Sequence, residues 1–291
     1  MLEASSLPQS VTRFYGNLDY ALDVIEKGQI AFVHISQLND PFDPYLFFES
    51  EFHKNRQEFI KYLKKFYPER ERWFRKWISP EGFQRGFKVV KDNLNARRKT
   101  TFMLSTCAEN RGNAPRDNLY MWGHYASGHR GIAIEFDTLA LTHSVIAHAS
   151  GFGYKQLSPG EIWVGVQYKA AFQPLTGQDY LDFLIYGEQT QAGSDEPKAP
   201  PSLERYLDLM LRLKSNVWKP ENEWRLLWTS DEIGPVYKCP INSSSIKTVI
   251  FGLRLSEQYR KDLRALLRHN FPTAKVLVAQ KRYGDFALEF D

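Results

Sequence analysis

Short β-type runs alternate along this chain with segments of helical periodicity, and this interleaving constrains the fold more than any other feature. Residues 130–137 (RGIAIEFD) alternate strictly, which is typical of a half-buried strand, and residues 223–229 (EWRLLWT) form another β-type run. Ser79 and Pro80 are a favourable helix start, and apolar side chains follow them at helical spacing. Strands and helices mixed in this way predict an α+β fold with a mainly antiparallel sheet.

Several classes of protein are disfavoured by what the sequence lacks. No stretch approaches the roughly 18 apolar residues of a membrane span, and the first residues do not read as a signal peptide. Cys107 and Cys239 are the only cysteines, too few for a disulfide framework or a four-thiolate zinc site. His124 and His129 lack the i, i+4 spacing of a helical zinc motif, so no metal is expected. A cytoplasmic location is the default expectation.

The positive charge of the chain is concentrated in one segment. Residues 54–99 hold 15 Lys and Arg against 5 Asp and Glu, although the whole chain has a net charge of only +4. We expect a basic helical insertion at residues 51–99 within a single domain that covers residues 1–291. Its surface could bind nucleic acid or an acidic protein partner, or it could simply keep the protein soluble. Residues 187–202 are rich in polar and small residues and are expected to form a flexible loop.

The stretch SQLNDPFDPY follows a β-type run and has two open interpretations. Asn39, Asp40 and Asp43 are flanked by prolines, and such residues form turns because their side chains bond nearby backbone N–H groups. The same polar side chains at the end of a strand are also placed as functional residues often are. The sequence predicts a turn here and leaves a binding role open.

A second polar stretch, WKPENEWRLLW, carries two carboxylates and an arginine at alternating positions. On a strand, Glu221, Glu223 and Arg225 would share one face. They could form an ion pair on a surface strand. They could also form a site, because Arg225 would keep a carboxylate ionised beside its neighbour, and such a carboxylate can stabilise an oxocarbenium-like centre. Upstream, Trp122 and Tyr125 share one side of a helical turn and could belong to the core or stack on a planar ring.

Together these motifs resemble the bacterial family of unknown function DUF2971. The resemblance is carried by Asn39-Asp40-Pro41-Phe42-Asp43, by Ser105, by Trp122-x-x-Tyr125, and by Trp218-x-x-Glu221-x-Glu223-x-Arg225. It extends from about Arg13 to about Leu253 and implies no activity by itself. It favours a site at the first motif, where the chain would turn and aim Asn39 or Asp43 into the same cleft as Glu223.

A second resemblance is to ADP-ribosyltransferases of the arginine–serine–glutamate type. Their arginine, Ser-Thr-Ser and Glu-x-Glu motifs occur here in the same order as Arg13, Ser105-Thr106-Cys107 and Glu221-Asn222-Glu223. Cys107 replaces the second serine, and the interval from Ser105 to Glu221 is long for that superfamily. The resemblance implies a split or strongly bent sheet and NAD as the substrate.

It also implies a role for each residue of the site. Glu223 would bind the nicotinamide-ribose hydroxyls and stabilise the transition state, and Glu221 would position or deprotonate the acceptor. Arg13 would hold an NAD phosphate, and Tyr15 or Tyr125 would stack on nicotinamide. The expected site thus combines catalytic Glu221 and Glu223 with the NAD-binding residues Arg13, Tyr15, Asn39, Asp43, Ser105, Trp122, Tyr125 and Arg225.

The sequence therefore leads to an NAD-dependent ADP-ribosyltransferase-like protein, such as a bacterial toxin or a phage-defence effector. One alternative is a non-catalytic module that binds nucleic acid or a nucleotide through residues 54–99. Another is a metal-independent hydrolase or nuclease that uses Glu221 and Glu223.

Overall fold

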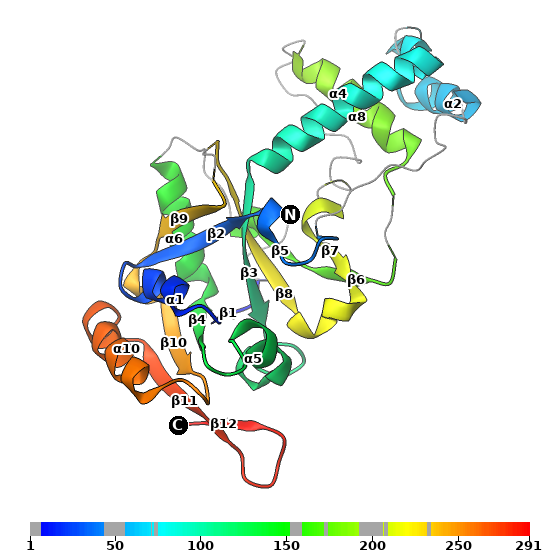
Figure 1. Ribbon diagram of the computed structural model, residues 1–291. Helices are drawn as coiled ribbons and strands as arrows, with labels where there is room; N and C mark the ends of the chain where they lie inside the picture. The colour runs from blue at the N-terminus through cyan, green and yellow to red at the C-terminus, as the bar shows by residue number, and fades with distance from the viewer. Residues whose placement is uncertain are drawn as a thin grey trace. The chain divides into compact units, whose positions relative to one another are not determined.

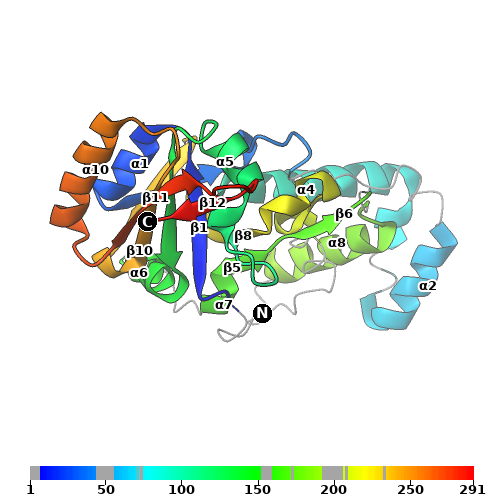
Figure 2. The same cartoon turned by 90° about the horizontal axis from the view of Figure 1, so that it is seen from below.

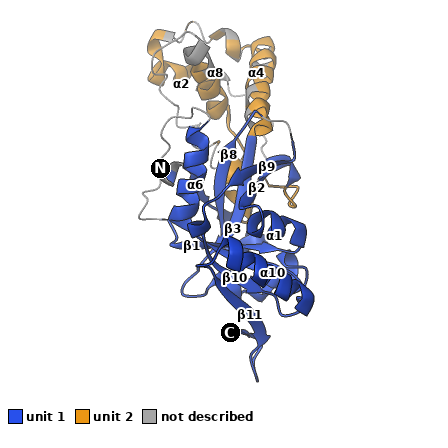
Figure 3. Ribbon diagram, turned by 90° about the vertical axis from the view of Figure 1, so that its left-hand side faces the viewer, with its two compact units in different colours: residues 1–37, 101–168, 216–291 blue, residues 38–100, 169–215 orange. Residues whose placement is uncertain are grey.

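The chain divides into two compact units, which are described separately (Figure 3). Unit 1 comprises residues 1–37, 101–168 and 216–291, and unit 2 comprises residues 38–100 and 169–215. The computed structural model describes residues 7–43, 56–70, 72, 75–151, 159–171, 174–191, 206, 209–231 and 234–291. Unit 2 is thus built from two segments of the chain that are separate in sequence. The expected insertion at 51–99 lies within the first of them, and the expectation of a single domain over residues 1–291 stays a prediction.

Unit 1 contains one large sheet with helices on both faces (Figure 1). Its strands are β1 (Ser10–Tyr15), β2 (Gln29–His34), β3 (Thr101–Ala108), β4 (Ile132–Asp137), β5 (Trp163–Gly165), β8 (Glu223–Thr229), β9 (Val236–Pro240), β10 (Ile246–Phe251), β11 (Lys275–Lys281) and β12 (Leu288–Phe290). Its α-helices are α1 (Leu18–Ile25), α5 (Leu119–Tyr125), α6 (Thr138–Ser150), α7 (Pro159–Ile162) and α10 (Glu257–Asn270). Short 3₁₀ segments are η2 (Ile35–Gln37), η6 (Pro115–Asp117), η7 (Asn216–Glu221) and η8 (Ser243–Ser245).

The strand order of this sheet is β12-β11-β10-β4-β1-β3-β2-β9, and β8 and β5 extend it from β3. Only the pairing of β10 with β11 is parallel, and all the other pairings of this sheet are antiparallel. The sheet is open rather than closed into a barrel. These features confirm the prediction of an α+β fold with a mainly antiparallel sheet.

The sheet splits at β3. Strand β8 pairs with one edge of β3 along residues 101–107. On the opposite edge, β2 pairs at Phe102 and Met103, whereas β1 pairs at Cys107 and Ala108. Residues 104–106 lie between the two registers, so β1 and β2 diverge from β3 in two branches. The split sheet that the sequence resemblance implies is therefore present.

The two faces of the sheet carry different hydrophobic clusters. Figure 2 shows the helices beside the sheet from below. Helices α1, α6 and α10 bury Val24, Leu141 and Leu263 on one face, which we call the three-helix face. Helix α5 buries Met121 and Trp122 on the other, which we call the α5 face. Strand residues alternate between these clusters, as the period of two of a strand requires.

Local sequence signals explain where several of these elements begin. Asn17 caps α1 by accepting a hydrogen bond from the N–H of Asp19, as its position predicts. Gly28, with φ of 60°, follows the helix before β2 begins. The alternating run at residues 130–137 forms β4, which confirms that prediction.

Unit 2 is mainly helical in its described part. Its elements are α2 (Arg56–Phe66), η4 (Pro68–Arg70), η5 (Arg75–Ile78), α4 (Pro80–Lys99), α8 (Gly177–Gln191) and β7 (Leu213–Ser215), and β6 (Gln167–Lys169) leads into it from unit 1. Ser79 caps α4 by accepting a hydrogen bond from the N–H of Gly82 at 3.1 Å. The hydroxyls of Tyr62 and Tyr67 both donate to Asp182 Oδ1, at 2.7 and 3.3 Å, and so fasten the segment around α2 to α8.

The loop expected at residues 187–202 overlaps the end of α8. Residues 187–191 are the last turn of α8, so the prediction of a loop is wrong there. Residues 192–202 lie outside the described residues, as do residues 51–55 of the expected insertion. Among the helices that the structure describes, none is long and apolar enough to cross a membrane.

Candidate functional site in unit 1

The beginning of strand β8 buries an ion pair. Arg225 Nε donates to Glu223 Oε1 at 2.9 Å and Nη2 donates to Oε2 at 3.2 Å, so both carboxylate oxygens are bound. Glu223 is 4% exposed and Arg225 is 0% exposed. A bidentate pair of this kind offsets the cost of burying each charge. The ion pair that the sequence suggests is therefore present, but β8 is an interior strand between β3 and β5 rather than a surface strand.

Glu221 reaches the same region from a different element. It is the last residue of η7 and not a strand residue, because Asn222 adopts a left-handed backbone conformation with φ of 44°. Asn222 tolerates this conformation and donates its side-chain amide to the carbonyls of Ala108 and Glu109, at 3.0 and 3.1 Å. The prediction that Glu221 and Glu223 share a strand face is thus wrong, because a turn at Asn222 interrupts the alternation.

Helix α5 brings Tyr125 to Glu221. Asn118 caps this helix by accepting from the N–H of Tyr120, and its side-chain amide donates to the carbonyl of Pro220 at 2.7 Å. With α5 fastened to η7 in this way, the Tyr125 hydroxyl donates a short hydrogen bond to Glu221 Oε1. Glu221 is 3% exposed, and Tyr125 is partly exposed.

The strand registers align the motif segments across three neighbouring strands. Cys107 of β3 is the register partner of Thr12 in β1 and of Glu223 in β8. Ser105 is the register partner of Arg225. Directly opposed residues of antiparallel strands project from the same face. Ser105, Cys107, Glu223 and Arg225 therefore all project from the α5 face of the sheet.

Tyr168 completes this cluster, although no sequence motif predicts it. Its hydroxyl accepts a hydrogen bond from the N–H of Glu223 at 2.8 Å, while the N–H of Val166 donates to the Glu223 carbonyl at 3.0 Å. Burial raises the pKa of the Tyr168 hydroxyl well above its usual value. The hydrogen bond from the N–H of Glu223 lowers this pKa in part, and the electrostatic effects of Glu223, Glu221 and Cys107 raise it. A single tyrosine in the run VQYK gives no motif, so only the folded chain associates it with Glu223.

Trp122 is a core residue. It is 0% exposed, its Nε1 donates to the carbonyl of Arg116 at 2.7 Å, and its ring packs edge-on against Phe14 with centroids 5.1 Å apart. The ring of His129 stacks on the Trp122 ring, with the two ring centroids 5.9 Å apart. The core interpretation therefore describes Trp122, which supports α5 from within and leaves Tyr125 as the aromatic residue beside the carboxylates.

Arg13 and Tyr15 start from the opposite face of the sheet. Because Thr12 shares a face with Cys107, its neighbour Arg13 projects from the three-helix face, and so does Tyr15. Arg13 Nη1 nevertheless reaches the split and donates to the carbonyl of Ser105 at 3.0 Å. Burial raises the pKa of Tyr15 to about 12, against the opposing effect of Arg13. Tyr15 is thus a buried core side chain, whereas the Arg13 guanidinium lies at the edge of β3.

A tight turn joins α5 to β4 and abuts the end of β1. Ser127 and His129 have φ of 49° and 69°, a region that residues other than glycine rarely adopt. A Cβ atom at Gly131 would overlap the carbonyl oxygen of Tyr15. Burial, with a smaller effect from Arg254, lowers the pKa of His129. Only glycine allows the backbone at position 131 to approach β1 so closely, which holds α5 in place.

Asn39 and Asp43 belong to unit 2. Asp40 accepts a hydrogen bond from the N–H of Phe42 at 2.9 Å, and the N–H of Asp43 donates to the Asp40 carbonyl at 3.0 Å. These bonds confirm the turn interpretation. The Asp43 carboxylate is buried 3.9 Å from the ammonium of Lys214, also in unit 2. Convergence of Asn39 or Asp43 with Glu223 would involve both units and stays a prediction.

Comparison with known proteins identifies one family. Residues 121–226 match the family model DUF2971, which is described as a protein of unknown function. This match confirms the resemblance to DUF2971 over a segment that holds Tyr125, Tyr168, Glu221, Glu223 and Arg225. No curated protein and no solved structure matches the chain. In the part of the chain that the structure describes, no three His, Cys, Asp or Glu side chains are grouped so that they could hold a metal ion.

Proposed function

We propose that unit 1 binds NAD and transfers its ADP-ribose group to an acceptor. The observation that carries this proposal is the register of β1, β3 and β8, in which Cys107 is opposite both Thr12 and Glu223. The three segments that resemble the arginine, serine and glutamate motifs of ADP-ribosyltransferases are therefore neighbours in one split sheet. Because β1, β3 and β8 are far apart in sequence, their adjacency in the sheet does not follow from the order of the motifs and supports the proposal.

Glu223 is the residue we assign to the chemical step. When the bond between nicotinamide nitrogen and ribose C1′ breaks, nicotinamide leaves with the bonding electrons and positive charge develops on the ribose. A fixed carboxylate stabilises that charge more strongly in the transition state than in NAD itself. The bidentate contact with Arg225 keeps the Glu223 carboxylate fixed in position.

Glu221 and Tyr125 are assigned to the acceptor. As the acceptor attacks C1′, its proton passes to the Glu221 carboxylate, which Tyr125 holds by a hydrogen bond. Tyr125 and Ser105 are partly exposed, so a ligand that approaches the buried carboxylates would meet these two residues first. Tyr125 is also the aromatic residue that could stack on nicotinamide, whereas the guanidinium of Arg13 at the split could bind an NAD phosphate.

The proposed NAD chemistry also suggests a biological setting. A bacterial toxin or a phage-defence effector in the cytoplasm would have NAD at hand as its substrate. Cys107 and Cys239 are buried thiols that are not joined in a disulfide, as is usual for proteins of a reducing compartment.

Labelled NAD tests the proposal directly. The protein is incubated with NAD labelled in the adenylate part and with bacterial lysate, and nicotinamide release and labelled macromolecules are both followed. We expect release by the wild type. Glu221→Gln should still release nicotinamide but transfer little label, because Glu221 serves the acceptor. If the wild type releases no nicotinamide with any lysate fraction, the proposal is wrong.

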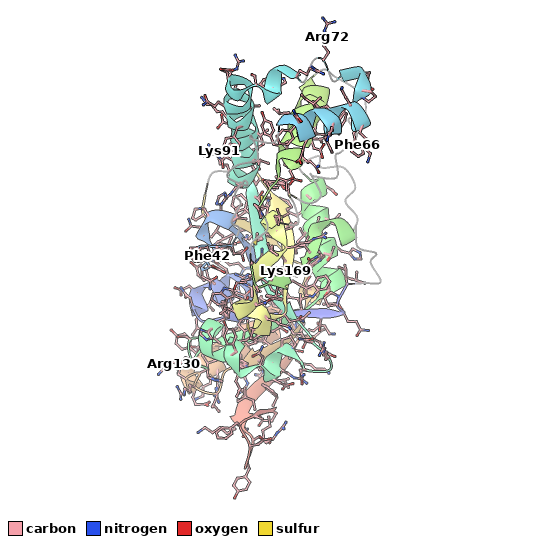
Figure 4. All side chains as sticks on the ribbon, turned by 90° about the vertical axis from the view of Figure 1, so that its right-hand side faces the viewer. Phe42, Phe66, Arg72, Lys91, Arg130 and Lys169 are labelled. Carbon is pink, nitrogen blue, oxygen red and sulfur yellow. The ribbon has the colours of Figure 1, made fainter. Side chains whose placement is uncertain are left out.

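A second candidate function belongs to unit 2, which could bind a polyanion such as nucleic acid. Among its described residues, the exposed cations of the first segment are Lys61, Lys64, Lys65, Arg72, Arg75, Arg85, Lys88, Lys91 and Lys99. The exposed acidic residues of the same segment are Glu58, Glu69, Glu81 and Asp92. The side chains of Arg72 and Lys91 project away from the helices (Figure 4). Phe66 of α2 is 54% exposed. Cations interspersed with an exposed aromatic ring suit phosphates and bases.

A further inference from the structure

Among the residues that the structure describes, the Tyr168 hydroxyl is not used as a hydrogen-bond donor, and Glu223 and Glu221 lie near enough to act on its pKa. Its oxygen accepts a hydrogen bond from the backbone N–H of Glu223 at 2.8 Å. This bond uses a lone pair of the oxygen, so the hydroxyl proton remains available for donation. Within the part of the chain that the structure describes, this hydroxyl donates to no protein atom. A half-buried donor without an acceptor costs free energy unless a ligand or water supplies one.

The surroundings keep that proton on the oxygen. Burial raises the pKa of Tyr168 above its usual value by more than the hydrogen bond from the N–H of Glu223 lowers it, and the carboxylates of Glu223 and Glu221 oppose a further negative charge nearby. Tyr168 therefore stays a neutral donor across the physiological pH range. It is held in place by β5, whose continuation at Val166 donates to the carbonyl of Glu223 at 3.0 Å.

We propose that Tyr168 is a ligand-binding residue that donates its hydroxyl proton to an oxygen atom of a sugar bound beside Glu223. This inference rests on the proposed function, in which the sugar is the nicotinamide ribose of NAD. Glu223 and Tyr168 have complementary roles there, because a carboxylate accepts hydrogen bonds from ribose hydroxyls and a phenol donates to a ribose oxygen. No motif in the sequence assigns this role.

The test measures NAD binding by calorimetry for four full-length proteins, which are the wild type, Tyr168→Phe, Glu223→Gln and the double variant. Tyr20→Phe serves as the control, since Tyr20 is an exposed tyrosine of α1. Tyr168→Phe should weaken NAD binding about tenfold, the scale of one lost hydrogen bond in a partly buried site. A direct contact with the ligand does not depend on the charge of Glu223, so the same loss should appear in the Glu223→Gln background.

The outcomes separate a binding role from a structural one. A loss in the wild-type background that disappears in Glu223→Gln would mean that Tyr168 only positions Glu223, and it would overturn the inference. Equal binding by wild type and Tyr168→Phe would also overturn it while leaving the proposed function intact. If the wild type does not bind NAD, the proposed function fails and the inference fails with it.

Discussion

Arg225 and Glu223 form a bidentate ion pair from two residues of the same strand face, with the guanidinium wholly buried. Strand β8 is enclosed by β3 and β5, so neither charge can be solvated if its partner is removed. The pair can be explained by stability alone or by the need for a fixed carboxylate. Stability and activity measurements on the two residues separate these explanations.

Removal of the arginine should be more damaging than removal of both charges. Arg225→Met removes the bidentate partner of the buried Glu223 carboxylate, and the expected loss is about 3–5 kcal/mol in the free energy of unfolding. Glu223→Gln with Arg225→Met removes both charges and should recover much of that loss. Urea unfolding monitored by tryptophan fluorescence gives the comparison. A cost below about 1 kcal/mol for Arg225→Met would show that water reaches the pair.

Gly131 and Gly123 offer a matched test of the turn after α5. Gly131→Ala should unfold the protein or cost several kcal/mol, because the new Cβ would overlap the Tyr15 carbonyl. At Gly123, within α5, a Cβ would meet no atom within 4 Å. Gly123→Ala should therefore stabilise the helix by about 0.5–1 kcal/mol. Thermal unfolding of both variants checks the pair, and similar midpoints would contradict the close approach.

The network around Asp23 predicts a pH-dependent contribution to stability. Hydrogen bonds from Lys238 and then Lys27, at 2.7 Å each, lower the pKa of Asp23 in the folded state. A lowered folded pKa adds stability above the unfolded value of about 3.9, and this stability is lost as pH falls through the folded pKa.

Asp23→Asn should therefore cost about 1 kcal/mol at pH 7, a modest figure because both lysines are partly exposed. The difference from wild type should shrink as the pH falls below about 4 and vanish below the folded pKa of Asp23. Urea unfolding between about pH 3 and pH 7 provides the measurement, with Asp262→Asn on the exposed side of α10 as the control. A cost that is independent of pH would mean that packing, and not charge, explains the effect.

The cations of unit 2 predict salt-dependent polyanion binding. Replacement of Lys61, Lys64, Lys65, Lys88 and Lys91 by alanine should weaken binding to a single-stranded oligonucleotide. It should also flatten the dependence of log K on log salt by about 0.7 for each phosphate that the variant no longer neutralises. Fluorescence anisotropy at several salt concentrations measures both effects. Glu58→Gln with Glu69→Gln is the control and should strengthen binding. No binding by the wild type even at low salt would assign these cations to solubility.

Local signals in the sequence account for where helices and strands begin in both units. Asn17 and Ser79 cap helices as their positions suggest, and the alternation at residues 130–137 predicts β4, whose Ile132, Ile134 and Phe136 all pack on the three-helix face. Such signals act within a few residues. They could not reveal that residues 169–215 join residues 38–100 in unit 2, because that association depends on contacts between distant segments.

In the candidate site, too, the sequence predicts the local features but not those that depend on contacts between distant segments. Glu223 and Arg225 are identified by their alternation, but the left-handed conformation of Asn222 moves Glu221 onto another element. Tyr168 carries no motif and joins the site only through the register of β5 with β8. Burial likewise decides that Trp122 belongs to the core.

The rate of nicotinamide release at saturating NAD tests the central claim most directly. It is measured for wild type, for Glu223→Gln and for Glu135→Gln, whose carboxylate lies on the same sheet face but on β4, with β1 and β3 between it and Glu223. Loss of the charge at Glu223 should slow release about 10²–10³-fold, the scale for one preorganised electrostatic group, while Glu135→Gln should match the wild type. Equal rates for wild type and Glu223→Gln would remove Glu223 from the mechanism and contradict the account.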